Sequence, residues 1–240
     1  MNQRIRTFVA GGLLALALFG SAMAGPLEDG QAAYQKGDFA TAFQILRPLA
    51  EQGDARAQCA VGLMYLLGQG VPHDDAQAVA WYRKAADQGN GDGQFGLGLR
   101  YLEGRGVPKD KPQGIAWIRN AAEQGNAFAE FYLGIAYGVG DGVPQDFARA
   151  ATWHRKAADH GETGSQNTLA QMYRDGQGVP QDYIRAHMWF NWAAAGTSDA
   201  SFHNKLAKDR DDVAAKMTPA QIAEAQRMAS EWTESHPSRR

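Results

Sequence analysis

Histidine and cysteine side chains are the residues of this chain best suited to holding a metal ion or attacking a substrate. There are six histidines and one cysteine: His73, His154, His160, His187, His203, His236 and Cys59. No two histidines have the H-E-x-x-H or i, i+4 spacing that puts two zinc ligands on one helix face. One cysteine allows no internal disulfide, so Cys59 is interpreted as a small apolar filler, with a redox or intermolecular thiol as the alternative. We therefore expect no metal and no other cofactor.

Catalytic motifs are absent from the sequence, with one formal exception. There is no S-x-x-K, K-T-G, G-x-S-x-G or P-loop pattern. Gly91 to Gly96 fits G-x-G-x-x-G, but that motif binds dinucleotides only where it follows a strand. Here it lies between two predicted helices, so we interpret it as a coincidence. No catalytic residue is assigned, and a weak amidase or lactamase remains an alternative.

Aspartates recur at a constant interval, which argues against catalysis by any one of them. They stand at Asp74, Asp110, Asp146 and Asp182. A catalytic group belongs to one special constellation, whereas equivalent copies indicate a structural role. Each aspartate directly precedes a predicted helix, where its carboxylate caps free backbone N–H groups.

The same interval of 36 residues governs the middle of the chain. Gly-x-Gly-Val-Pro ends at Pro72, Pro108, Pro144 and Pro180, and tryptophan follows at Trp81, Trp117, Trp153 and Trp189. Such a period without insertions predicts one supersecondary unit stacked in series. We place four units at 50–85, 86–121, 122–157 and 158–193.

Each unit contains two predicted helices. In the first unit Ala57, Val61 and Tyr65 lie four residues apart on one helix stripe, and Gly68 and Pro72 end that helix. Two helices cannot bury their apolar sides alone, but stacked neighbours can. The predicted fold is all-α, a right-handed α-solenoid superhelix of antiparallel helix pairs. A capping pair is expected at 25–49, capping helices at 194–232 and a disordered tail at 233–240.

The first 24 residues have the features of a secretory signal peptide. Arg4 and Arg6 precede an apolar run, and Ala22-Met23-Ala24 fits a cleavage site before Gly25. A membrane anchor is the alternative. We expect a mature protein that is periplasmic or secreted and does not span the membrane. It would carry 22 basic and 26 acidic side chains, which gives no basic excess for binding nucleic acid.

The repeat resembles the Sel-1-like repeat, a relative of the tetratricopeptide repeat. The resemblance rests on Gly68-x-Gly70-Val71-Pro72 with Asp74, Trp81 and Lys84-Ala85-Ala86, and it covers residues 50–193. It implies a TPR-like solenoid that acts as a scaffold or adaptor for other proteins. The disulfides of secreted cysteine-rich members are missing here.

The resemblance also implies that the first helix of each unit lines a concave groove. Helix periodicity then directs one set of apolar side chains into that groove, and we predict partner contacts at Leu63, Phe95, Leu99, Phe128, Phe131 and Ile135. The alternative is that neighbouring helices, or the C-terminal helices folding back, bury these positions. The expected partner is a protein or peptide bound by a monomer, with cell-wall glycan or peptide as the alternative.

Overall fold

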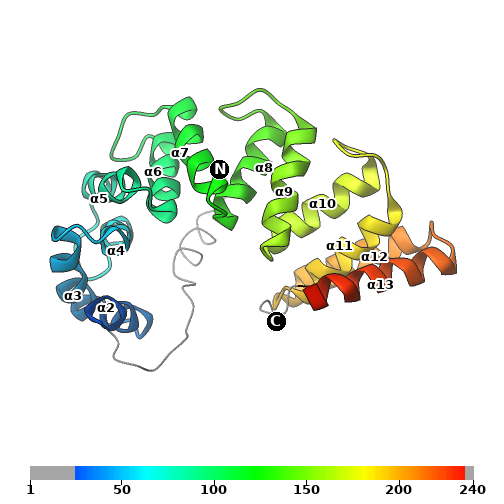
Figure 1. The fold of residues 1–240 in the computed structure, drawn as a ribbon, viewed down its shortest axis with the longest axis horizontal. Coiled ribbons are helices and arrows are strands. Elements are labelled where there is room, and N and C mark those ends of the chain that lie inside the picture. The colour runs from blue at the N-terminus through cyan, green and yellow to red at the C-terminus, as the bar shows by residue number, and fades with distance from the viewer. Residues whose placement is uncertain (1–24, 236–240) are drawn as a thin grey trace. The chain divides into compact units, whose positions relative to one another are not determined.

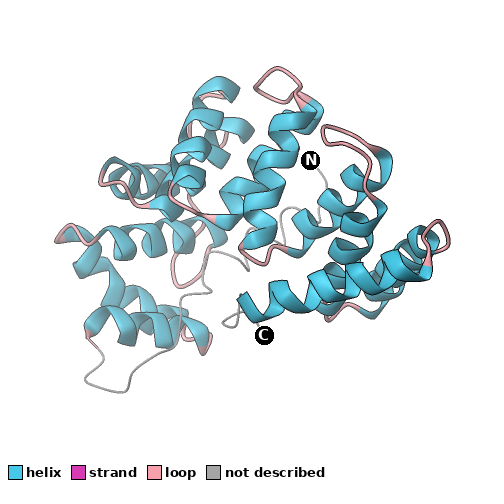
Figure 2. Ribbon diagram, turned by 45° about the vertical axis from the view of Figure 1, so that its right-hand side comes forward, coloured by secondary structure: helices cyan, strands magenta, loops and turns pink. Residues whose placement is uncertain are grey.

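The computed structural model describes residues 25–235, and all regular elements in this range are helices (Figures 1 and 2). They are α2 (Pro26–Gln35), α3 (Phe39–Glu51), α4 (Ala55–Leu67), α5 (Asp75–Asp87), α6 (Gly91–Glu103), α7 (Lys111–Glu123), α8 (Ala127–Val139), α9 (Phe147–Asp159), α10 (Thr163–Asp175), α11 (Tyr183–Ala195), α12 (Ala200–Ala214) and α13 (Pro219–Ser235). The predicted all-α class is confirmed for this range. The predicted signal peptide, residues 1–24, lies outside it.

The chain divides into two compact units, which we describe separately. Unit 1 ends at Phe128 and unit 2 begins at Ala129. In unit 1, each helix from α2 to α6 packs on the next helix in sequence, and α4 also contacts α6. In unit 2, α10 packs on α9 and on α11, and α11 also packs on α12 and α13. Packing between neighbours in sequence is the arrangement of an α-solenoid.

Local signals set the helix boundaries as predicted. The Asp74 carboxylate accepts hydrogen bonds from the backbone N–H groups of Ala76 and Gln77 at 2.9 and 3.0 Å. The other three repeated aspartates cap α7, α9 and α11, and each accepts one hydrogen bond from the backbone N–H three residues further along the chain. The preceding helices end at left-handed glycines, such as Gly68 with φ of 66° and Gly104 with φ of 71°. The repeated aspartates are therefore helix caps.

In the Gly-x-Gly motifs that end at Gly70, Gly106 and Gly178, the second glycine has a packing role in addition to its positive φ. A Cβ on Gly106 would overlap the backbone carbonyl of Asp75, and one on Gly178 would overlap that of Phe147. Asp75 and Phe147 are the first residues of α5 and α9. Each of these loops thus lies against the first turn of the second helix in the preceding repeat.

The C-terminal helices pack on the last repeat. Trp232 of α13 lies edge-on to Trp189 and Trp192 of α11, with ring centroids 5.8 and 4.2 Å away. Thr218 and Gln221 form the expected capping box, with the Thr218 N–H donating to Gln221 Oε1 at 2.8 Å. Helix α13 runs to Ser235, beyond the predicted end at Trp232. The start of the predicted disordered tail is therefore helical, and residues 236–240 lie outside the described range.

Candidate functional site

Apolar side chains line the outward side of α8. Phe131 and Ile135 are half-buried, and Val139 is 67% exposed. These positions follow one another at intervals of four residues, so they share one side of the helix. Together with Gly138 they form what we call the α8 face, which belongs to unit 2. Phe128 is also half-buried but is the last residue of unit 1.

The Phe131 ring fixes how the α8 face meets α10. It lies edge-on to the His154 imidazole, with centroids 5.9 Å apart. A Cβ built on Gly164 of α10 would lie 3.2 Å from the Phe131 Cε2. The ring is therefore seated where α10 has no side chain, and α8 and α10 meet at this point.

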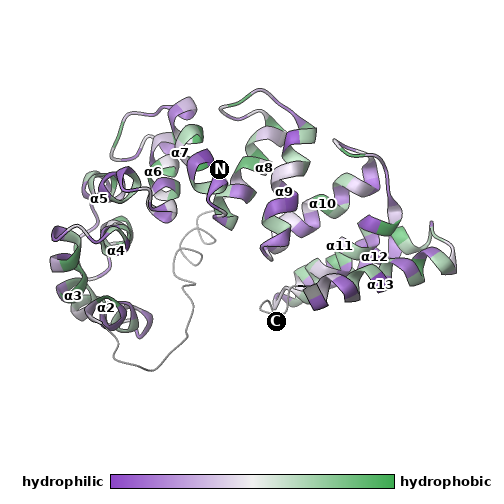
Figure 3. Cartoon of the chain, viewed as in Figure 1, coloured by the Kyte–Doolittle hydropathy of each residue, from purple (hydrophilic) through white to green (hydrophobic). Residues whose placement is uncertain are grey.

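The equivalent side of α10 is polar and uncharged over its middle turns. Asn167 and Gln171 are half-buried there, and the Gln171 Nε2 donates to the Asn167 Oδ1 at 3.2 Å. Only Arg174 and Asp175 at the C-terminal end are charged, and they pair with each other at 2.8 Å. Figure 3 shows the contrast, with green segments in α8 and mostly purple colour in α10.

Three of the predicted contact residues lie in the core of unit 1 instead of on an open groove. Leu63, Phe95 and Leu99 are only 2%, 3% and 2% exposed. The structure thus supports the alternative for these residues, because α4 packs on α3, α5 and α6, and α6 packs on α4, α5 and α7. Phe128, Phe131 and Ile135 keep partial exposure. Contact of the six residues with a partner remains a prediction.

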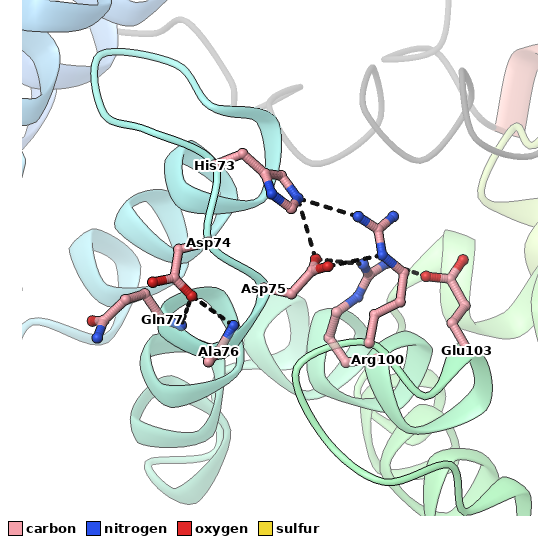
Figure 4. Close-up of polar contacts among 8 residues, drawn as sticks. His73, Asp74, Asp75, Ala76, Gln77, Arg100 and Glu103 are labelled. Carbon is pink, nitrogen blue, oxygen red and sulfur yellow. Dashed lines mark hydrogen bonds and ion pairs between the residues drawn. The ribbon is translucent and has the colours of Figure 1, made fainter.

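A charged network between α5 and α6 was not expected from the sequence (Figure 4). Asp75 Oδ2 accepts from Arg105 Nε at 3.0 Å, and Arg100 Nη2 pairs with Glu103 Oε2 at 2.9 Å. His73 Nε2 lies 3.4 Å from Asp75 Oδ1. The sequence did contain one indication of this network. Arg100 is charged, whereas the other repeats have Met64, Ala136 and Met172 at the same position.

Arg100 is buried without full hydrogen bonding. Its side chain is 5% exposed, and neither Nε nor Nη1 has a hydrogen-bond partner among the described protein atoms. Nη1 lies 3.9 Å from Asp75 Oδ1, which is close enough for attraction but too far for a hydrogen bond. Two carboxylates and two guanidinium groups balance in charge, so the network joins two repeats and provides no free charge for a ligand.

One serine–histidine contact occurs in unit 2. The His154 Nδ1 lies 3.1 Å from the Ser165 Oγ. Ser165 is fully buried and His154 nearly so. Burial lowers the pKa of His154 to about 4, so it is neutral near pH 7. A nucleophile must reach its substrate. Because Ser165 and His154 are both buried, a substrate cannot reach this pair in the described conformation.

Metal and membrane features can be assessed for residues 25–235. No group of three or more His, Cys, Asp or Glu side chains in this range is arranged to hold a metal ion. None of the helices in it combines the length and the apolar character needed to cross a bilayer. Cys59 is buried, and burial raises the pKa of its thiol.

Helix pairs stacked in series with capped ends define the class of α-solenoid repeat proteins. Within that class the chain belongs to the Sel1 repeat family, whose model, described as Sel1 repeat, matches residues 20–54, 55–90, 91–126, 127–162 and 164–198. Four of the matched units start five or six residues later than the four predicted units, since the starting point of a cyclic pattern is arbitrary, and the match at 20–54 adds a fifth repeat. Members of this family typically serve as scaffolds for protein interactions and are generally non-catalytic.

Solved structures of similar proteins agree with this assignment. A Sel1 repeat protein from Oxalobacter formigenes shares 29% identity with a TM-score of 0.67, over 79% of this chain and 83% of that one. A protective antigen present in uropathogenic Escherichia coli strains, which displays an SLR fold, shares 32% identity with a TM-score of 0.66 over 88% of this chain. This chain matches 54% of that antigen's length. No curated protein of comparable sequence was found.

Proposed function

We propose that this protein is an exported, non-catalytic scaffold that binds a protein or peptide partner on the α8 face. The observation that best supports this proposal is the partial exposure of Phe131, Ile135 and Val139, three apolar side chains on one side of a helix. Exposed apolar side chains that are contiguous mark interaction sites more often than isolated ones do. The groove predicted along all repeats is thereby reduced to the part that lies in unit 2.

Two features support a scaffold role over an enzymatic one. Ser165 and His154 are buried together, and the charged groups around Arg100 neutralise one another. The α8 face contains no nucleophile and no ionisable group. Binding there would rest on apolar contact and shape, which suits a passive adaptor.

The decisive experiment places a photo-cross-linking amino acid at Val139 in the full-length protein and irradiates living cells. The matched control carries the same amino acid at Thr152, an exposed position on α9. We expect a discrete cross-linked protein from Val139, absent from Thr152 and lost when Phe131→Ser is added to the Val139 protein. Equal products from both positions, or cross-links to cell-wall sacculi only, would contradict a protein partner on this face.

Export rests on the sequence of residues 1–24 and has its own test. The full-length gene should yield a protein whose N-terminal residue is Gly25, found in the periplasmic fraction. Mass spectrometry of the purified protein reads the cleavage site directly. An intact N-terminus in the membrane fraction would support the membrane anchor instead.

A further inference from the structure

Asn90 and Gly91 form the only Asn-Gly pair in the sequence. Asn90 is the N-cap of α6 in unit 1, Gly91 is the first residue of that helix, and both are half-buried. Glycine has no Cβ, so the nitrogen of Gly91 can approach the preceding side chain with little hindrance. A Cβ built on Gly91 would meet no other segment of the chain within 4 Å, so the space beside the pair is open. The matching residues of the other repeats carry side chains: Ala55, Ala127 and Thr163.

The start of a helix favours attack of the Gly91 nitrogen on the Asn90 side-chain amide. The N–H of the first helical residue has no carbonyl partner within its own helix. The Asn90 Oδ1 accepts a hydrogen bond from the Gly93 backbone N–H at 2.8 Å, and a donor at this oxygen stabilises the negative charge that forms there during the attack. Asparagines inside helices instead precede an N–H that is bonded along the helix, and these are Asn120, Asn167, Asn191 and Asn204.

Three contacts keep the first turn of α6 closed and so oppose the attack. One is the cap bond from Gly93 to Asn90. A second joins the turn to the next repeat, because the Asn126 Nδ2 donates to the Asp92 Oδ1 at 2.8 Å. The third is packing on α5, since a Cβ on Gly93 would lie 2.6 Å from the Ala85 Cβ. Asn90 has an extended ψ of 117°, which turns the Gly91 nitrogen away from the Asn90 side chain. The turn must therefore open before the two groups can react.

We propose that Asn90 is a site of spontaneous deamidation, reached when the first turn of α6 opens. The Gly91 nitrogen gives its proton to water and bonds to the Asn90 Cγ. The side-chain amide nitrogen takes up a proton and leaves as ammonia, which closes a five-membered imide. One water molecule then opens the imide. Cleavage at Cγ leaves aspartate at position 90, and cleavage at the backbone carbonyl carbon leaves an isoaspartyl linkage. Water is the only co-reactant, and no atom is oxidised or reduced.

The two products differ in their effect on α6. Aspartate at position 90 keeps an oxygen that accepts from Gly93, as Asp54 accepts from the Ala57 N–H at 2.8 Å in the first repeat. Its negative charge at a helix N-terminus is favourable. The isoaspartyl linkage adds a methylene group to the backbone, so the side chain no longer reaches Gly93 and the first turn loses its cap. One site thus yields a product that keeps the fold and another that loosens unit 1.

The test follows the mature protein in mildly alkaline buffer by peptide mapping with mass spectrometry. Fragmentation by electron transfer distinguishes the aspartyl from the isoaspartyl product. We expect conversion at Asn90 and none at Asn126, which has the same position one repeat later but precedes Ala127. Gly91→Ala introduces the residue found at Ala55 and Ala127 and should slow the conversion about tenfold or more.

A second pair of variants tests whether opening of the turn controls the rate. Asp92→Ala removes the bond to Asn126 and should speed conversion at Asn90 about two- to tenfold, the change in open population expected from losing one hydrogen bond. Its matched control is Asp87→Ala, which removes a negative charge from an exposed position near the end of α5 and should leave the rate unchanged. The full chain unfolded in urea should convert faster than the folded protein.

Three results would overturn the proposal. Conversion at Asn90 in urea but not in the folded protein would show that the turn does not open far enough. Equal conversion at Asn126, or an unchanged rate in Gly91→Ala, would remove the role of Gly91. Equal rates in Asp92→Ala and Asp87→Ala would show that the contacts of the first turn do not control the reaction.

Discussion

Helices α6 and α8 hold equivalent places in consecutive repeats and have opposite surroundings. Phe95 and Leu99 on α6 are buried, whereas Phe131 and Ile135 at the matching positions of α8 are half-buried. The residue types are nearly the same, so the apolar pattern alone did not set exposure. What differs is how far other side chains cover these residues: Phe95 and Leu99 are 3% and 2% exposed, whereas Phe131 and Ile135 keep partial exposure.

Glycines in the two helices show the same contrast. A Cβ on Gly98 of α6 would lie 2.6 Å from the Ile118 Cγ1 and 2.8 Å from the Gly114 carbonyl oxygen, so this glycine allows α7 to approach closely. Gly138 of α8 has no such neighbour. One glycine tightens the core and the other leaves an empty position on the surface.

The largest expected effect on stability comes from replacing a buried phenylalanine by alanine, with a half-buried phenylalanine for comparison. Phe95→Ala should lower the free energy of unfolding by roughly 3–5 kcal/mol, the usual cost for a fully buried aromatic ring. Phe131→Ala should cost clearly less, because its half-buried ring leaves a smaller cavity. Urea unfolding of the mature protein measures both. Equal losses would show that α8 is as well covered as α6.

Acid should weaken unit 2 through His154. Burial lowers the pKa of this imidazole to about 4, below its value of about 6.5 in the unfolded chain. The neutral side chain therefore stabilises the fold fully above about pH 6.5, and about 3 kcal/mol is lost as pH falls to about 4. His154→Ile, with the residue found at Ile118, should flatten this part of the pH profile in urea unfolding. A profile identical to that of the unaltered protein would exclude His154 as the cause.

Alanine at the two contrasting glycines should change stability in opposite directions. Gly98→Ala should cost roughly 1–3 kcal/mol because the methyl group meets Ile118 and a backbone carbonyl. Gly138→Ala should gain up to about 1 kcal/mol from helix propensity alone. Thermal unfolding of the two variants measures whether each substitution lowers or raises the stability. A loss of stability in Gly138→Ala would mean that the side-chain position at Gly138 is already occupied.

Breaking the charged network of unit 1 should lower the stability by a smaller amount, and a second substitution should restore it. Arg100→Met leaves Glu103 without its partner and should cost roughly 1–2 kcal/mol. Adding Glu103→Leu reproduces the Met64 and Leu67 pair of the first repeat and should recover this loss, since apolar replacement of a buried ion pair is often neutral or better. A double variant less stable than Arg100→Met would show that the network has a net stabilising role.

Local features of the fold followed from the sequence because they depend on residues close in the chain. The capping box at Thr218 and Gln221 joins residues three positions apart, and the Asp74 cap reaches Ala76 and Gln77. Only part of the candidate site could be predicted from the sequence. Helix periodicity predicted contacts at Phe131 and Ile135, which keep partial exposure, but the same rule also selected Phe95 and Leu99, which are buried.

The sequence by itself determined the repeat, the helices, their caps and the family, since a fixed period copies the same short-range contacts into each unit. Tertiary structure decided which outward faces stay open, why Gly98 and Gly138 differ, and how Arg100 meets Asp75 across two repeats. Burial and ion pairing depend on side chains that other helices supply, and those neighbours exist only after the chain has packed.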